Sequence, residues 1–203
     1  RAGAYNIPLT PVRTTASWLV TLTKAFEISN ENLFIDPIYN AINYLLRDDL
    51  RPDGYTFQAR KSEQKDECDG LVGQAAPICG LAYAGNVFDH EAALSTAKNI
   101  FELHPFNNRL GLWERVEIDG TYLSFDRTLN HQIIFAGSAI PLANRFDSVA
   151  ETCISFIDNL SDNIEAHRDG LPRHYVRPDP SIVLPVVATS FRHWPLLWNE
   201  VAI

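Results

Sequence analysis

The sequence predicts an all-α fold, an α/α toroid (part of an (α/α)6 barrel) made of helix hairpins with short β-hairpins at one rim. Three observations predict it: amphipathic helical patterns recur, alternating and aromatic stretches separate them, and the plan repeats about every 57 residues. With 46% hydrophobic and 21% charged residues, the chain has the composition of a globular protein. We expect a single domain over residues 1–203, and a fragment of a longer chain, because six such units need roughly 340 residues.

The first two helices are expected over residues 16–28 and 36–47, each with apolar residues on one face. Asp36 stands in a capping position before Pro37, whose missing N–H costs nothing in the first turn. The apolar positions are Trp18, Leu19, Leu22, Ala25 and Phe26 in the first helix and Ile38, Tyr39, Ile42, Leu45 and Leu46 in the second.

Four further helices are expected over residues 71–88, 90–103, 129–144 and 148–161. The first and third of these are apolar almost all round, which indicates inner helices packed on both sides, whereas the other two are amphipathic. Predicted caps are Asp89 and the capping-box pair Ser148 and Glu151. The side chains predicted to be buried between helices are Ile42, Leu46, Leu94, Ile100, Phe101, Ile154 and Ile157.

Strand-like stretches at 53–60, 111–125 and 169–176 separate the helices. Asp119-Gly120, flanked by alternating residues, predicts a tight hairpin turn because this dipeptide tolerates the positive φ that the turn requires. Alternation along the hairpin would present Trp113, Arg115 and Glu117 on one face. Gly54, Gly111 and Gly170 open successive copies of the plan, at offsets of 57 and 59 residues.

The repeat predicts a pocket. An offset of 57 residues places Asp69 under Asp126 and Gln74 under His131, at equivalent helix entrances. In a toroid these entrances open at one end of a central funnel, so their polar side chains converge. The predicted set is Asp69, Gln74, Asp126, Arg127, Asn130, His131 and Gln132. The alternative is that both aspartates only cap helices, and that the histidine is an ordinary core or surface group.

Aromatic and basic residues on the strand-like stretches extend this prediction. Trp113 and Tyr55 are suited to stacking on a sugar ring, and Arg60 and Arg115 to binding a sugar carboxylate in a bidentate manner. Core packing and a solvated strand face are the alternatives, and core packing is favoured for Phe57 and for Tyr122.

Composition excludes several classes of function. The formal charge is −8 and no basic run would follow a phosphate backbone, so no nucleic-acid partner is expected. Three widely spaced cysteines form no zinc set, so they are expected to be reduced, with no metal and no cofactor. Without a signal peptide or an unbroken apolar span, we expect a cytoplasmic protein with no membrane partner. His104, at a helix end, is expected to be a charged partner of the helix dipole.

The segment "DGLVGQAAPICGLAYAGNVFDHEAALSTAKNIFELHPFNNRLGLWERVEIDG" resembles the helix–helix–hairpin units of the six-hairpin glycosidase superfamily, notably the unsaturated glucuronyl hydrolases. The resemblance covers roughly residues 53–145. It implies an aspartate at the start of each of two successive inner helices, one acting as general acid/base on an unsaturated uronic acid, and Asp69 and Asp126 match in placement and order. After Asp126 the sequence departs from that family, because Arg-Thr-Leu-Asn-His replaces a glycine-rich turn containing tryptophan.

The chain also resembles the N-acylglucosamine 2-epimerase type of sugar epimerases and isomerases, which use histidines as acid/base groups. That resemblance implies such a role for His131, with His174 or His193 as a partner.

Three functions therefore stay open, each with an oligosaccharide or sugar as the partner. The first is a glycoside hydrolase acting on a uronic-acid-containing or related oligosaccharide, with Asp126 as general acid/base and Asp69 assisting. The second is a sugar epimerase or isomerase with His131 as the base. The third is a non-catalytic glycan-binding toroid.

Overall fold

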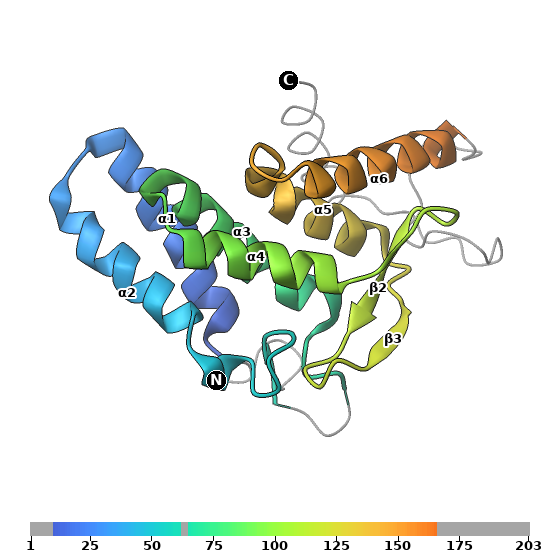
Figure 1. Cartoon of the computed structure of the whole chain (residues 1–203), viewed down its shortest axis with the longest axis horizontal. Coiled ribbons are helices and arrows are strands. Elements are labelled where there is room, and N and C mark those ends of the chain that lie inside the picture. The colour runs from blue at the N-terminus through green and yellow to red at the C-terminus, as the bar shows by residue number, and fades with distance from the viewer. Residues whose placement is uncertain (1–9, 62–64, 166–203) are drawn as a thin grey trace.

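The computed structural model describes residues 10–61 and 65–165 of the chain (Figure 1). The helices in these ranges are α1 (Val12–Ser29), α2 (Ile35–Leu45), α3 (Gly70–Phe88), α4 (Glu91–Leu103), α5 (Leu129–Ala143) and α6 (Asp147–Glu165). The strands are β1 (Phe106–Asn107), β2 (Leu112–Val116) and β3 (Tyr122–Phe125), and single 3-10 turns lie at Asn32–Phe34 and Asp48–Leu50. All six predicted helices are confirmed. The strand-like stretch at 169–176, Gly170, His174 and His193 lie outside the described residues.

The helices form two rows. α3 packs against α1 on one side and α5 on the other, and each of these three pairs with the helix that follows it in the chain. α3 and α5 bury residues around most of their circumference, as the apolar sequences predicted, whereas α4 buries one stripe. Inner helices α1, α3 and α5 therefore alternate with outer helices α2, α4 and α6, which is the predicted toroid arrangement (Figure 1).

Two glycines of α3 allow close helix packing, Gly80 within the inner row and Gly85 between the two rows. A Cβ at Gly80 would lie 2.8 Å from the carbonyl oxygen of Ala16 in α1, and one at Gly85 would lie 2.8 Å from Leu94 Cγ in α4. Among the described helices, α3 is the one long and apolar enough to span a membrane by length and composition. Because 61% of that stretch is buried between its neighbours, its apolar character is explained by its central place.

The predicted hairpin is confirmed. β2 pairs antiparallel with β1 and with β3. The turn has Gly120 at φ +83°, and the Glu117 N–H donates to the Thr121 carbonyl at 2.9 Å. The expected strict alternation along β2 is wrong, because the register shifts between Glu114 and Val116, and adjacent residues Leu112 and Trp113 are both buried.

The core is centred on stacked aromatic rings. Phe101 is 2% exposed, and its ring centroid lies 5.2 Å from that of Phe135 and 5.7 Å from that of Trp113. The prediction of burial is confirmed for Ile42, Leu94, Ile100 and Phe101. Leu46 and Ile157 are partly buried against the core.

Four apolar predictions are wrong: Ile154, Trp18, Tyr39 and Tyr122 are exposed. A narrow stripe is enough to join each helix to its neighbours, so an apolar residue beside the stripe stays in solvent. The buried residues are Val12, Ala16, Leu19 and Thr23 in α1, Ile38, Ala41, Ile42 and Leu45 in α2, and Val149, Cys153, Phe156 and Leu160 among the α6 residues up to 160.

The predicted helix caps are also corrected. Asp36 lies inside α2, which continues directly from a 3-10 turn and has no side-chain cap. His90 caps α4, accepting the Ala93 N–H on Nδ1 at 3.3 Å, while Asp89 ends α3 in the left-handed conformation at φ +50°. The Ser148 hydroxyl donates to Glu102 Oε1 at 2.7 Å, so it does not form the predicted capping box.

His104 is not a charged helix-dipole partner. The ring is buried, with Nδ1 2.8 Å from the Ile100 carbonyl oxygen, so a proton on Nδ1 is donated there. Burial lowers the pKa of His104 to about 4, which outweighs the contribution of that hydrogen bond. The side chain is therefore neutral at pH 7.

Candidate active site

A pocket of about 600 Å³ opens where the loop before α3, the β2–β3 hairpin and the start of α5 meet. Three residues predicted to share a pocket, Asp69, Asp126 and His131, all line it. The full lining is Arg60, Lys65, Asp66, Asp69, Gly70, Arg115, Leu123, Asp126, Thr128 and His131. These three side chains therefore lie in one pocket, together with several residues that the repeat did not predict.

Asp126 and His131 form a hydrogen-bonded pair in this pocket. Asp126 Oδ2 lies 2.9 Å from His131 Nδ1, and the aspartate side chain is 9% exposed while the histidine is 37% exposed. The second oxygen, Oδ1, accepts the Thr128 N–H at 3.1 Å. A carboxylate at Nδ1 favours the tautomer that carries its proton there, which leaves Nε2 available as a base.

The charge of Asp126 is favoured by its neighbours. Burial by itself would raise the pKa of Asp126, but the hydrogen bond and charge of His131, the Thr128 N–H and the charge of Arg115 outweigh burial and hold the pKa below its ordinary value. The carboxylate therefore stays ionised at neutral pH and is suited to stabilising an imidazolium.

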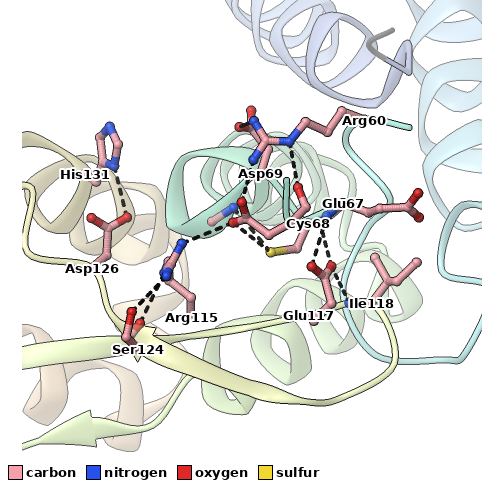
Figure 2. A network of polar contacts seen from close by, with 12 residues as sticks. Arg60, Glu67, Cys68, Asp69, Arg115, Glu117, Ile118, Ser124, Asp126 and His131 are labelled. Carbon is pink, nitrogen blue, oxygen red and sulfur yellow. Dashed lines mark hydrogen bonds and ion pairs between the residues drawn. The ribbon is translucent and has the colours of Figure 1, made fainter. Parts of the chain in front are cut away.

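Two more carboxylates are held by arginines. Arg60 Nη2 lies 2.6 Å from Asp66 Oδ1, and its Nη1 lies 2.7 Å from Asp69 Oδ1. Arg13, from α1, reaches Asp69 Oδ2 at 2.8 Å, and Arg115 reaches Asp66 Oδ2 at 3.3 Å. Figure 2 shows the Asp126–His131 pair on one side of Arg115 and the Asp69 loop on the other.

Gly70 marks where the carboxylates approach one another. A Cβ at this residue would lie 3.5 Å from Asp126 Oδ2, 3.7 Å from Asp66 Oδ2 and 3.3 Å from Arg115 Cδ. Asp66, which the sequence reasoning missed, therefore faces the same point as Asp126. The feature of the sequence that could have indicated Asp66 is its position three residues before Asp69, in the charged segment that leads into an inner helix. Lys65, Leu123 and Thr128 were missed as well, and no motif marks them.

Gln74 and Gln132 are not pocket residues. Both are fully buried and each clamps a strand-like segment: Gln74 exchanges hydrogen bonds with the backbone N–H and C=O of Phe57, and Gln132 does the same with Trp113. These buried backbone groups need hydrogen-bond partners, which explains why both glutamine side chains face inward and not toward the pocket.

These clamps also correct the repeat alignment. Gln132, and not His131, is the equivalent of Gln74. The Gln74 Nε2 donates to the Cys68 carbonyl at 2.7 Å, and the Gln132 Nε2 donates to the Asp126 carbonyl at 2.5 Å. Cys68 is therefore the equivalent of Asp126, and Asp69 lies one position further along. Of these two repeat units, one carries the acid–histidine pair.

Four other predicted site residues do not line the pocket. Trp113 is 1% exposed, with its ring against Phe101, Phe106, Phe135 and Phe156, so it cannot stack on a sugar. Tyr55 is partly exposed but covers the hairpin turn, with Cζ 2.7 Å from a Cβ built at Gly120. Arg127 is exposed and Asn130 is half-buried, both outside the lining.

The capping alternative is wrong for both aspartates. Asp69 precedes α3 in the left-handed conformation, at φ +56°, and makes no cap hydrogen bond; Thr128, and not Asp126, precedes α5 as its N-cap. Bidentate capture of a sugar carboxylate by Arg60 or Arg115 is not supported either. All three guanidinium nitrogens of Arg60 already donate to oxygens of Asp66 and Asp69. Those of Arg115 donate to oxygens of Asp66 and Ser124.

Comparison with solved structures decides the fold. The chain aligns with a cellobiose 2-epimerase from Bacillus thermoamylovorans at a TM-score of 0.69 and 13% identity, over 83% of this chain and 48% of that one. The chain has the α/α toroid fold. A family 88 glycosyl hydrolase from Bacteroides vulgatus (TM-score 0.59, 12% identity, 94% of this chain and 61% of that one) and a polysaccharide lyase (0.61, 15%, 94% and 60%) are similar too. All three neighbours have the toroid fold that the sequence predicted.

In sequence, the chain is 43% identical over 192 residues to archaeal glycosylation protein Q of Haloferax volcanii, an alignment that covers 94% of this chain and 51% of that protein. The chain thus spans about half the length of this curated relative. No protein-family model matches the sequence.

Proposed function

We propose that this chain carries the acid/base centre of a carbohydrate-active toroid enzyme, in which His131 transfers a proton and Asp126 orients it. The observation that carries the proposal is the 2.9 Å contact between Asp126 Oδ2 and His131 Nδ1 inside the shared pocket. Similarity to an epimerase, a hydrolase and a lyase, each named for a reaction on carbohydrates, and to a glycosylation protein, supports a sugar or oligosaccharide as the substrate.

The reaction that this geometry favours is proton transfer at a sugar carbon, as in an epimerase or isomerase. His131 Nε2 takes the proton from the carbon next to the carbonyl of an open-chain sugar, and the C–H electron pair forms an enediolate. Asp126 stabilises the resulting imidazolium. His131 then returns the proton on the same face to the neighbouring carbon, while the hydroxyl proton of the enediolate moves from one oxygen to the other, which gives the isomer. Epimerisation at the original carbon requires in addition a second proton donor on the opposite face of the enediolate. Asp66 and Asp69 accept hydrogen bonds from sugar hydroxyls.

Hydrolysis of a uronic-acid-containing oligosaccharide is the second candidate, with Asp126 as general acid/base and Asp69 assisting. One observation favours it: carboxylates from the entrances of two successive inner helices line one pocket. A general acid must hold a proton at working pH, however, and the pKa of Asp126 is lowered. The first candidate is therefore the better supported.

The test is incubation of the protein in D2O with cellobiose, glucuronic acid and an unsaturated glucuronyl disaccharide, followed by NMR of the sugar. Proton transfer puts deuterium on the carbon next to the reducing-end carbonyl and leaves the glycosidic bond intact, whereas hydrolysis releases a new reducing end. Any deuterium introduced by hydrolysis of the unsaturated disaccharide lies on the former double-bond carbon of the cleaved product. His131→Gln should reduce deuterium incorporation by ~10²–10⁴, the usual share of a general base. Asp126→Asn should also reduce it, by removing the group that orients the histidine.

His90→Gln is the matched control, because His90 caps α4 outside the pocket lining and should leave incorporation unchanged. New reducing ends that depend on Asp126 more than on His131 would favour hydrolysis instead. If the parent binds these sugars but converts none of them, both enzyme hypotheses are wrong and the chain is a glycan-binding toroid.

A further inference from the structure

Glu117, at the end of the β2 side of the hairpin, binds three backbone N–H groups. Oε1 accepts from Cys68 and from Ile118, both at 2.8 Å, and Oε2 accepts from Glu67 at 2.9 Å. The side chain is half-buried and does not line the pocket. An ionised carboxylate has about four acceptor sites and no donor, which suits it to three N–H groups at once.

Two of these N–H groups belong to the loop that carries the pocket carboxylates. Glu67 and Cys68 lie between Asp66 and Asp69 in the sequence. Arg115, two residues before Glu117 on the hairpin, binds the Asp66 carboxylate itself. The hairpin therefore holds this loop twice, through its backbone and through a side chain (Figure 2).

The loop also has little room to shift toward α3. A Cβ at Gly73 would lie 2.0 Å from the Cys68 carbonyl oxygen and 2.7 Å from Asp69 Cβ. Cys68, a residue of this loop, is fully buried. With α3 behind it and Glu117 in front, the loop is fixed from two sides.

We propose that Glu117 is a positioning residue: through the backbone of Glu67 and Cys68, it holds Asp66 and Asp69 in the sugar pocket. The hairpin that leads into α5 thereby orients carboxylates that belong to the preceding repeat unit. The role of these carboxylates in sugar binding rests on the proposed function, whereas the positioning itself does not.

The first test needs no sugar. In Glu117→Gln, one of the two acceptor oxygens becomes an NH2 group that cannot accept a loop N–H, and the remaining oxygen is a weaker, neutral acceptor, so the hold on the loop is weakened. Hydrogen exchange at the Glu67 and Cys68 amides should accelerate by at least about tenfold, and iodoacetamide should label Cys68, located by mass spectrometry, faster by a similar factor. Glu114→Gln, the same change on the same strand, should leave both rates unchanged. Parent-like rates in Glu117→Gln would overturn the proposal.

The second test separates positioning from a general loss of fold. On whichever of the three sugars the parent converts, Glu117→Gln should raise KM by about tenfold or more and change kcat much less, because displaced carboxylates bind the sugar poorly while His131 is intact. A lower kcat at unchanged KM would indicate fewer folded molecules and would contradict positioning.

If Glu117→Gln does not fold, Glu117→Asp keeps the charge, loses one methylene of reach and should show the same faster exchange. If Glu117→Gln shows faster exchange and labelling than the parent, but the parent binds none of the sugars, the positioning is upheld and the proposed function is refuted.

Discussion

Gln132→Leu is the substitution that most clearly tests how the hairpin and α5 are joined. The change keeps the approximate size of the side chain and removes hydrogen bonds to the Trp113 N–H (3.0 Å), the Trp113 carbonyl (3.0 Å) and the Asp126 carbonyl (2.5 Å). Each buried group left without a partner costs about 1–3 kcal/mol. With some relaxation, we expect a loss of about 3–5 kcal/mol in the free energy of unfolding.

The assay is urea unfolding followed by tryptophan fluorescence, with Gln74→Leu and Gln58→Leu as companions. Gln74 makes the equivalent three bonds to Phe57 and Cys68, so its loss should be similar. Gln58 donates one side-chain hydrogen bond, to Glu67, at a partly exposed site, and should lose about 1 kcal/mol. A loss in Gln132→Leu no greater than that in Gln58→Leu would refute the clamp.

Three further predictions concern the core and the response to pH. Phe101→Ala should cost about 3–5 kcal/mol in urea unfolding, against less than 1 kcal/mol for the exposed Ile154→Ala; equal losses would contradict the assigned core. Because the pKa of His104 is lowered to about 4, the unfolded chain binds more protons between pH 6.5 and 4, so stability should fall by about 3 kcal/mol as pH drops through that range. His104→Gln should remove this part of the pH dependence. The pKa of Asp126 is also lowered, so its contribution to stability is present above the unfolded value near pH 4 and is lost as pH falls below it. Asp126→Asn should flatten this acid limb of the stability curve, and a slope equal to that of the parent would contradict the hydrogen-bonded environment assigned to Asp126.

Much of the fold was predictable because short-range rules determine it. The two nearly uniformly apolar helices are the inner ones, and Asp119-Gly120 forms the turn, since periodicity and turn chemistry are local properties. The sequence did not reveal the depth of burial of Trp18 or Ile154. That depth depends on which neighbouring helix covers each face, and a tryptophan beside the buried stripe has the same local pattern as one within it.

The pocket was predictable in part for a different reason. The repeat placed Asp69, Asp126 and His131 at one end of the helices, where the structure has them. The roles of Gln74, Gln132 and Trp113 were not predictable, because a glutamine that clamps a strand and one that binds a sugar look alike in sequence. Similarly, the pairing of Asp126 with His131 depends on side-chain geometry between the loop before α5 and the first turn of that helix.

The most direct test of the account is the NMR of the His131 imidazole in 15N-labelled protein, recorded near neutral pH with and without sugar. If Asp126 orients His131 for proton transfer, the ring carries its proton on Nδ1, and the Nε2 signal shifts when cellobiose or the unsaturated glucuronyl disaccharide is added, while the buried His104 does not respond. A His131 ring protonated on Nε2, or signals that no sugar displaces, would contradict the assignment of this pair as the centre that acts on the substrate.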